Sequence, residues 1–280
     1  MVNNKFTGSK SNTRPVGVGG GFRFKKKLGQ NFLVDTGVTH KITQHISNVR
    51  SATIIEIGPG SGALTTSLLE CNPAELIIIE IDQDLLPHLK DLRKLLDKNF
   101  QIVHADALQI SEESLTEKRF KIVSNLPYNI GTALIIKWLH KIHLVDEIIV
   151  MLQREVAERI VANKSSKAYG RISVLAQSLC HCEKLFDVSP HSFYPQPKVT
   201  SSVVRLKPKE NLLSPLDVTK LEKACKALFN YRRKKITTYL KKDFPNIESI
   251  LCDLLINVNA RAESLSIKDF YNLSQKINFR

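Results

Sequence analysis

The chain has 280 residues, of which 42% are hydrophobic and 24% are charged, a composition typical of a globular protein that buries a core. No apolar run reaches the roughly 18 residues that a transmembrane helix needs, and residues 1–30 lack the hydrophobic segment of a secretory signal. The five cysteines form no even-numbered disulfide framework and fit a reducing compartment.

The net charge of +14 is concentrated at the two ends of the sequence. Residues 1–30 hold seven basic and no acidic residues, and residues 205–280 hold sixteen basic and eight acidic ones, which leaves a formal charge of −1 for the rest. A near-neutral central region between two basic ends is typical of an enzyme that binds a polyanion through its terminal segments. Basic residues also serve solubility alone, so this pattern indicates a nucleic-acid partner without naming it.

Helical and strand patterns alternate along most of the chain. Residues 1–24 are rich in Gly, Asn and Ser and are expected to form a flexible extension. Asp35 is a suitable N-cap for the first helix. Strands are then expected over residues 53–57, 75–80, 101–104, 121–124 and 147–152, and helices over residues 63–70, 85–96 and from 153 onward. Near residues 199–206 the alternation predicts a hairpin or an edge strand.

These apolar strands, separated by amphipathic helices, predict an α/β fold with a mostly parallel sheet that is covered on both faces. After residue 209 the pattern changes to Leu-rich helices with basic faces. We therefore expect one domain over residues 25–209 and a small all-helical C-terminal domain over residues 210–280.

A glycine-rich turn joins the first strand to its helix. It reads Glu56-Ile57-Gly58-Pro59-Gly60-Ser61-Gly62-Ala63. Glycines allow a tight turn and close approach to a ligand, and the N-terminus of the helix offers free amides. The pattern fits NAD as well as S-adenosylmethionine, and a tight turn without a ligand has the same sequence. Gly58 and Gly60 are the candidate cofactor contacts.

Two acidic residues follow the next two strands and narrow the choice of ligand. Glu80 ends the second strand, where its carboxylate can accept hydrogen bonds from both ribose hydroxyls of a nucleoside. Asp106 follows the third strand, and its carboxylate can accept a hydrogen bond from an adenine amine. Each can instead be a helix cap. Because parallel strands end at the same edge of a sheet, the pair outlines an adenosine pocket there.

The sequence Asn125-Leu126-Pro127-Tyr128 follows the fourth strand. The lone pair of an adenine amine is delocalised into the ring, so the amine is a poor nucleophile. If the Asn125 side-chain oxygen and the Leu126 carbonyl accept its two N–H bonds, the nitrogen becomes more pyramidal and its lone pair is available. Pro127 fixes the backbone beside that carbonyl, and the Tyr128 ring can stack on the base. The alternative is an ordinary loop with a proline turn.

Six blocks of sequence, in order, resemble the small-subunit rRNA adenine-N6,N6-dimethyltransferases of the KsgA type. They are residues 28–33 (LGQNFL), 56–60 (EIGPG), 125–128 (NLPY), 193–201 (FYPQPKVTS), 229–235 (FNYRRKK) and 260–266 (ARAESLS). The resemblance implies a Rossmann-like class I methyltransferase fold with a mostly parallel seven-stranded sheet. It also implies dimethylation of two adjacent adenosines in the 3′-terminal hairpin loop of 16S rRNA, within the immature small ribosomal subunit.

The same resemblance implies a set of site residues. Those that match the family's S-adenosylmethionine site are Asn31, Leu33, Gly58, Glu80, Asp106 and Asn125, and Gly60 of the turn joins them. Phe193 is expected to sandwich the target base together with Tyr128. The loop adenosine is already unpaired, so swinging it into the pocket costs little.

Two basic clusters are the candidate RNA contacts. One is Lys25, Lys26 and Lys27, and the other is Arg232, Arg233, Lys234 and Lys235, which we expect on a helix. Simple solubility and a nuclear-localisation signal are the alternatives for such clusters. We expect no metal, because the run at residues 180–182 (CHC) has no second ligand pair at suitable spacing and methyl transfer depends mainly on positioning.

Other functions fit parts of the sequence. A dinucleotide-dependent dehydrogenase would use the glycine turn but leaves residues 125–128 and the basic ends unexplained. A large-subunit rRNA adenine methyltransferase of the antibiotic-resistance type shares the chemistry, although Leu126 and the block at residue 229 favour the small-subunit group. A non-catalytic nucleic-acid-binding relative is the third alternative. We expect a monomer in the bacterial cytoplasm, while the acid-free N-terminus also fits a mitochondrial transit peptide.

Overall fold

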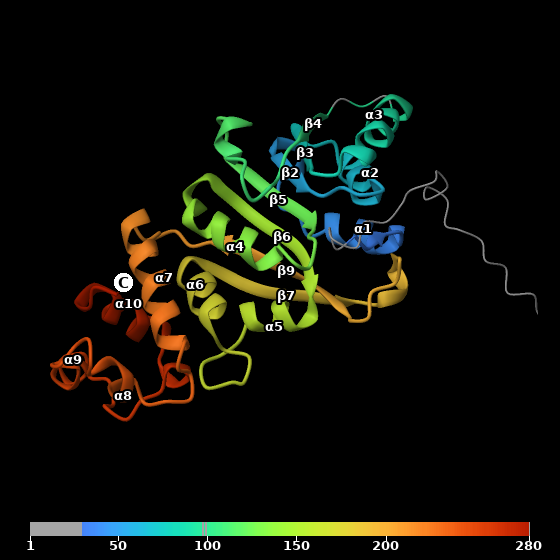
Figure 1. Ribbon diagram of the computed structural model, residues 1–280. Coiled ribbons are helices and arrows are strands. Elements are labelled where there is room, and N and C mark those ends of the chain that lie inside the picture. Colours follow the sequence, from blue (N-terminus) through green and yellow to red (C-terminus); the bar gives the residue numbers. More distant parts are fainter. Residues whose placement is uncertain (1–29, 97, 99, 280) are drawn as a thin grey trace, which may run out of the picture.

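The computed structural model describes residues 30–96, 98 and 100–279 (Figure 1). The predictions for residues 1–24 and for Lys25, Lys26 and Lys27 lie outside these residues. The strands are β1 (Phe32–Leu33), β2 (Thr53–Ile57), β3 (Glu75–Glu80), β4 (Gln101–His104), β5 (Phe120–Asn125), β6 (Val145–Gln153), β7 (Cys180–Val188), β8 (Phe193–Tyr194) and β9 (Ser201–Pro208). The α-helices are α1 (Thr36–Thr43), α2 (Ala63–Glu70), α3 (Leu86–Leu95), α4 (Gly131–His140), α5 (Arg154–Ile160), α6 (Arg171–Leu179), α7 (Pro215–Phe229), α8 (Ile236–Leu240), α9 (Ile247–Asp253) and α10 (Ile267–Lys276).

Seven strands form one sheet in the order β4-β3-β2-β5-β6-β9-β7 (Figure 1). The strands from β2 to β6 pair in parallel, whereas β9 runs antiparallel to both β6 and β7. This arrangement confirms the predicted α/β class and the mostly parallel seven-stranded sheet. The strands at 53–57, 75–80 and 101–104 and the helix at 63–70 have the predicted bounds.

The antiparallel part of the sheet corrects one prediction. The hairpin alternative is confirmed, because β9 pairs antiparallel with β7. The edge-strand alternative is wrong, because β9 lies between β6 and β7, and the strand at this edge of the sheet is β7, for which the sequence offered no prediction. β7 begins at Cys180 directly after α6 ends at Leu179, so no Gly or Pro marks the change from helix to strand.

Helices cover both faces of the sheet. On one face, Ile54, Ile78 and Met151 pack in a hydrophobic cluster with buried residues of α1, α2 and α3. On the other, Ile55 and Ile122 pack with buried residues of α4, α6 and α7. Successive side chains of a strand point to opposite faces, so burial on both faces explains why these strands lack polar alternation.

The chain after residue 209 is helical, as predicted. The helices α7 to α10 follow β9, and α7 places buried leucines in the same hydrophobic cluster as Trp138 of α4 and Leu175 of α6. The division into separate domains at residues 209 and 210 stays a prediction. None of the helices within the described ranges is long and apolar enough to cross a bilayer.

Candidate active site

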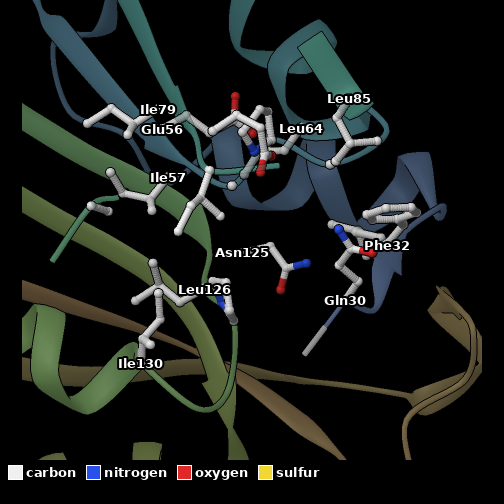
Figure 2. A pocket seen from close by; sticks show the side chains of 18 of the residues that line it. Gln30, Phe32, Glu56, Ile57, Leu64, Ile79, Leu85, Asn125, Leu126 and Ile130 are labelled. Carbon is white, nitrogen blue, oxygen red and sulfur yellow. The ribbon is translucent and has the colours of Figure 1, made fainter. Parts of the chain in front are cut away.

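A deep pocket opens at the carboxyl ends of β2, β3, β4 and β5, the edge of a parallel sheet where ligands usually bind (Figure 2). Apolar side chains and a few polar groups line it together, as is usual for a small-molecule site. All seven residues predicted to bind a cofactor line it, namely Asn31, Leu33, Gly58, Gly60, Glu80, Asp106 and Asn125. Leu126, Pro127 and Tyr128 line the same pocket. The fold therefore brings together residues that are up to 97 positions apart in the sequence.

Gly58 and Gly60 of the glycine turn line the pocket. At Gly60 the backbone conformation and the surrounding atoms leave room only for glycine. Gly60 has a φ of +59°, and a Cβ atom added there would lie 2.6 Å from a ring carbon of Phe32. The turn leads into α2 at Ala63, so the backbone approaches the pocket closely at the N-terminal end of that helix.

Glu56, inside the turn motif, is a carboxyl group that the sequence did not single out as a site residue. It is fully buried, lines the pocket and accepts a hydrogen bond from Thr65 Oγ1 at 2.7 Å. Burial raises its pKa from 4.5 to about 8, the Thr65 hydrogen bond opposes this rise, and the charge of Glu80 adds to it. A positively charged ligand in the pocket would favour the ionised form of Glu56.

The two predicted acidic residues both line the pocket, and the carboxylate of each also accepts a hydrogen bond from a nearby backbone amide. Glu80 is 4% exposed and accepts a hydrogen bond from the Asp82 amide at 2.8 Å; burial raises the pKa of its carboxyl. Asp106 Oδ1 accepts a hydrogen bond from the Leu108 amide at 2.9 Å. Asp106 therefore caps a turn and lines the pocket at once, and its ligand role stays a prediction.

Asn125 ends β5 with its side chain in the pocket (Figure 2). Its Nδ2 donates a hydrogen bond to the backbone carbonyl of Asn31 at 3.3 Å, which assigns the remaining acceptor, Oδ1, to the pocket side. The buried Ser124 Oγ donates to the Ile57 carbonyl at 2.6 Å, and the Leu126 amide donates to the Met151 carbonyl at 3.2 Å. These bonds fix the backbone on both sides of Asn125.

Of the two aromatic residues predicted to sandwich a base, Tyr128 lines the pocket and Phe193 lies in the hydrophobic core. The Tyr128 hydroxyl is 2.6 Å from Ser201 Oγ of β9, which anchors the ring at the pocket, and burial raises its pKa. Phe193 is 4% exposed, pairs with Leu33 across the short β1–β8 sheet and packs in the hydrophobic cluster beside α1. It does not line the pocket, so the structure does not bring Phe193 and Tyr128 together, and its stacking role stays a prediction.

Several pocket residues lie outside the predicted set. Gln30 and Phe32 flank Asn31, and Gln30 Nε2 donates to Asp82 Oδ2 at 2.7 Å, which ties this segment to the end of β3. Ile81, which follows Glu80, is 47% exposed and offers an apolar surface. Gln30 and Phe32 belong to the LGQNFL block at residues 28–33, which also holds the predicted residues Asn31 and Leu33, so this block could have indicated them. No motif in the sequence points to Ile81.

The basic cluster at residues 232–235 does not lie on a helix as predicted, but in the turn between α7 and α8. Arg232 forms an ion pair with Glu263 at 2.9 Å and donates to the Ser166 carbonyl, and Lys235 Nζ donates to Asn259 Oδ1 at 2.9 Å. Two of the four side chains thus tie the turn to neighbouring segments, which explains the irregular backbone.

The other two side chains of this cluster face solvent. Arg233 and Lys234 are exposed and line a second, open hollow on the surface, together with Lys167, Arg261 and the half-exposed Tyr231. Lys234 Nζ lies 5.2 Å from the centre of the Tyr231 ring. This hollow combines positive charge with an aromatic surface.

The CHC run lies on β7, where neighbouring side chains point to opposite faces. Cys180 is buried and His181 is exposed on the other side, so the three side chains cannot share one ion. Burial raises the pKa of both Cys180 and Cys182, the latter to about 12. Among the residues that the structure describes, no three His, Cys, Asp or Glu side chains gather as metal ligands.

Known proteins resemble this chain over most of its length. The family model described as "Ribosomal RNA adenine dimethylase" matches residues 21–278. The chain is 39% identical over 253 residues to the Ribosomal RNA small subunit methyltransferase A of Wolbachia sp. subsp. Drosophila simulans, covering 90% of this chain and 93% of that protein. It is also 39% identical over 253 residues to the protein of the same name from Ehrlichia ruminantium, covering 90% and 97%.

Solved structures agree with these relatives. A dimethyladenosine transferase from Plasmodium falciparum is similar with a TM-score of 0.75 and 25% identity, covering 88% of this chain and 98% of that one. The 23S rRNA methyltransferase ErmE is similar with a TM-score of 0.66 and 25% identity, covering 88% and 99%. The fold is that of a Rossmann-like class I methyltransferase. The chain belongs to the ribosomal RNA adenine dimethylase family.

Proposed function

We propose that this protein uses S-adenosylmethionine to dimethylate the N6 amines of two adjacent adenosines in the 3′-terminal hairpin loop of 16S rRNA, during assembly of the small ribosomal subunit. The observation that carries the proposal is the orientation of Asn125, whose amide nitrogen is held by the Asn31 carbonyl while its oxygen is left for a donor in the pocket. Relatives about 40% identical over 90% of the chain, which are named for methylation of small-subunit RNA, support the choice of substrate.

The pocket residues fit S-adenosylmethionine in shape and in chemistry. The Glu80 carboxylate suits two ribose hydroxyls, and the Asp106 carboxylate suits an adenine amine, with Ile81 and Ala107 as apolar neighbours for the ring. The missing side chain at Gly60 lets the Phe32 ring pack closely against the turn that lines the pocket. The cofactor would supply a methyl group bound to a positively charged sulfur, a charge that the buried Glu56 carboxylate complements.

The acceptor side is built from Asn125 to Tyr128. Asn125 Oδ1 and the Leu126 carbonyl accept the two N–H bonds of the target amine and so direct its lone pair into the pocket. The Tyr128 ring, held through its hydroxyl by Ser201, stacks on the target base, which is the usual way that proteins hold an unpaired base. Positioning of this kind accounts for catalysis without a metal.

RNA binding is assigned to the basic ends of the chain. Arg233 and Lys234 are exposed residues of the 232–235 cluster that line the hollow, and the Tyr231 ring beside them can stack on a second unpaired base. Arg232 and Lys235 support the turn and contribute positive charge from there. We extend the RNA contact to Lys25, Lys26 and Lys27 and to a helical C-terminal domain over residues 210–280, on the basis of charge.

The compartment and the oligomeric state are part of the proposal. Both bacterial relatives named above methylate ribosomal RNA by name, which supports the bacterial cytoplasm rather than the mitochondrial matrix. A monomer suffices, because one chain supplies the cofactor pocket and the acceptor residues.

The similarity to ErmE makes methylation of large-subunit RNA the second candidate function. Incubation with labelled S-adenosylmethionine and equal amounts of immature small subunits and deproteinised large-subunit RNA separates the two. We expect label in the small subunit alone. Label only in large-subunit RNA would replace the proposal with the second candidate. Binding of cofactor without label in either RNA would indicate the non-catalytic relative.

A further inference from the structure

Lys137 lies on α4, two turns after the acceptor loop, and it reaches the segment that carries Asp106. Its Nζ donates to the Ala107 carbonyl at 2.7 Å, to the Ile110 carbonyl at 2.5 Å and to Glu112 Oε1 at 2.8 Å. An ammonium group has three donors, so these three bonds use its full capacity. Ala107 lines the pocket beside Asp106.

The bonds of Lys137 are sheltered from water. Its side chain is 19% exposed, and its partner Glu112 is 1% exposed. Trp138, the next residue of α4, is buried and donates from Nε1 to the same Glu112 oxygen at 2.8 Å. Hydrogen bonds to charged groups in such a site hold geometry more firmly than exposed ones, which are weakened by solvent.

The geometry points to Lys137 as a positioning residue for the cofactor's adenine. The segment from Ala105 to Ile110 contains only a short turn that Asp106 itself caps, and Lys137 fixes two of its carbonyls from outside. Through these bonds α4 holds the Asp106 carboxylate at the place where it meets the adenine amine. The same helix begins directly after the acceptor residues, so one rigid element sets both the cofactor side and the acceptor side of the pocket.

Lys141 provides a control four residues after Lys137, at the C-cap position that follows α4. It donates to Ser111 Oγ at 2.7 Å and to Glu113 Oε2 at 2.5 Å, and it is 32% exposed. Its partners do not line the pocket. Lys141 therefore carries the same charge as Lys137 and lies near it in the chain, but it lacks the link to Asp106.

The test measures binding of S-adenosylhomocysteine and of its inosine analogue, which lacks the adenine amine, by calorimetry on the full chain. Because Lys137→Met alone would leave Glu112 buried without its ion-pair partner, the decisive variant is Lys137→Met combined with Glu112→Gln, which removes both charges and keeps an acceptor for Trp138. The wild type should prefer the adenine ligand by about tenfold, the value of roughly one hydrogen bond. The double variant should lose this preference while keeping a cooperative thermal transition, and Lys141→Met should keep it.

The inference rests on the proposed function, and the two fail in different ways. If the wild type binds neither ligand, the proposed function fails. If the wild type discriminates and the folded double variant discriminates equally well, or if Lys141→Met loses the preference to the same degree, Lys137 has no positioning role. A wild type that binds both ligands equally would overturn the assignment of Asp106 and with it that of Lys137.

Discussion

The side-chain nitrogen of Asn125 donates a hydrogen bond to the backbone carbonyl of Asn31 across 3.3 Å, and so joins the acceptor loop to the segment that borders the cofactor pocket. The two residues are 94 positions apart in the sequence. This bond decides which end of the Asn125 amide faces the pocket, because a carbonyl can only accept. The acceptor oxygen is thereby oriented before any substrate arrives, which is the condition for catalysis by positioning.

Replacement of Asn125 should therefore affect chemistry more than folding. For Asn125→Ala we expect single-turnover methyl transfer to fall by about two to three orders of magnitude, the usual cost of removing one hydrogen-bonding group that acts in the transition state. Asn125→Asp keeps an acceptor but cannot donate to Asn31, and the carboxylate should turn away from that carbonyl, so a loss of similar size is expected. An Asp variant with near wild-type rates would show that the Asn31 bond does not orient the acceptor.

The hydrogen bond between Tyr128 and Ser201 predicts that substitutions at these two residues have non-additive effects. Tyr128→Phe and Ser201→Ala each keep the ring, so each should raise KM for the RNA only several-fold, while Tyr128→Ala should raise it by about tenfold or more through lost stacking. The double variant Tyr128→Phe with Ser201→Ala should be no worse than either single variant. Strictly additive effects of the two changes would contradict the coupling.

The backbone of the glycine turn predicts unequal effects of two similar substitutions. Gly60→Ala combines a positive φ with a Cβ position 2.6 Å from the Phe32 ring, whereas Gly58→Ala has a φ of +62° but only ordinary contacts at 3.7 Å with Pro127. Both should lower the free energy of unfolding by about 1–2 kcal/mol through backbone strain. Gly60→Ala should lose more than Gly58→Ala in urea unfolding and should also bind S-adenosylhomocysteine more weakly. Equal losses would contradict the close approach of Phe32.

Glu56 predicts a dependence of stability on pH. Its pKa in the folded protein, about 8, lies above the ordinary value of 4.5, so the unfolded chain holds fewer protons on this group between these pH values. The free energy of unfolding contributed by Glu56 therefore falls as pH rises from 4.5 to about 8, and the raised pKa of Glu80 acts in the same direction.

A comparison of Glu56→Gln with the wild type isolates this effect. The variant should gain stability relative to the wild type between pH 5 and pH 8 by on the order of 1–4 kcal/mol, because it has no proton to lose and keeps an acceptor for Thr65. Urea unfolding at the two pH values in the absence of ligand measures the difference. Parallel pH profiles of the two proteins would show that Glu56 titrates at its ordinary pKa.

The parallel half of the sheet was predictable because its strands are continuous apolar runs bounded by turn residues. Thr53–Ile57 and Glu75–Glu80 match their predicted bounds for this reason. β7 was not predictable, because its alternation of polar and apolar residues breaks at Glu183-Lys184 and Leu185-Phe186, where the register shifts, and because it follows α6 without a turn residue. The basic residues at 232–235 follow a helical pattern locally, but tertiary bonds to Glu263 and Asn259 hold them in a turn.

The pocket was predictable where residues follow strand ends, because parallel strands bring their carboxyl ends to one edge. The position of Phe193 was not, since only the pairing of β8 with β1 turns that side chain into the hydrophobic cluster. The role of Lys137 was not predictable either. Its partners are the backbone carbonyls of Ala107 and Ile110, about 30 residues away, and any residue type at those positions would offer the same carbonyl.

The dimethyltransferase activity is tested by a count of methylated nucleosides in 16S rRNA after incubation of immature small subunits with the protein and S-adenosylmethionine. Nucleosides from the digested RNA are separated and identified by mass spectrometry, with Asn125→Ala in a parallel reaction. We expect two N6,N6-dimethyladenosines per 16S rRNA with the wild type and almost none with the variant. Methyl groups on another nucleoside, or equal amounts of product from the variant, would contradict it.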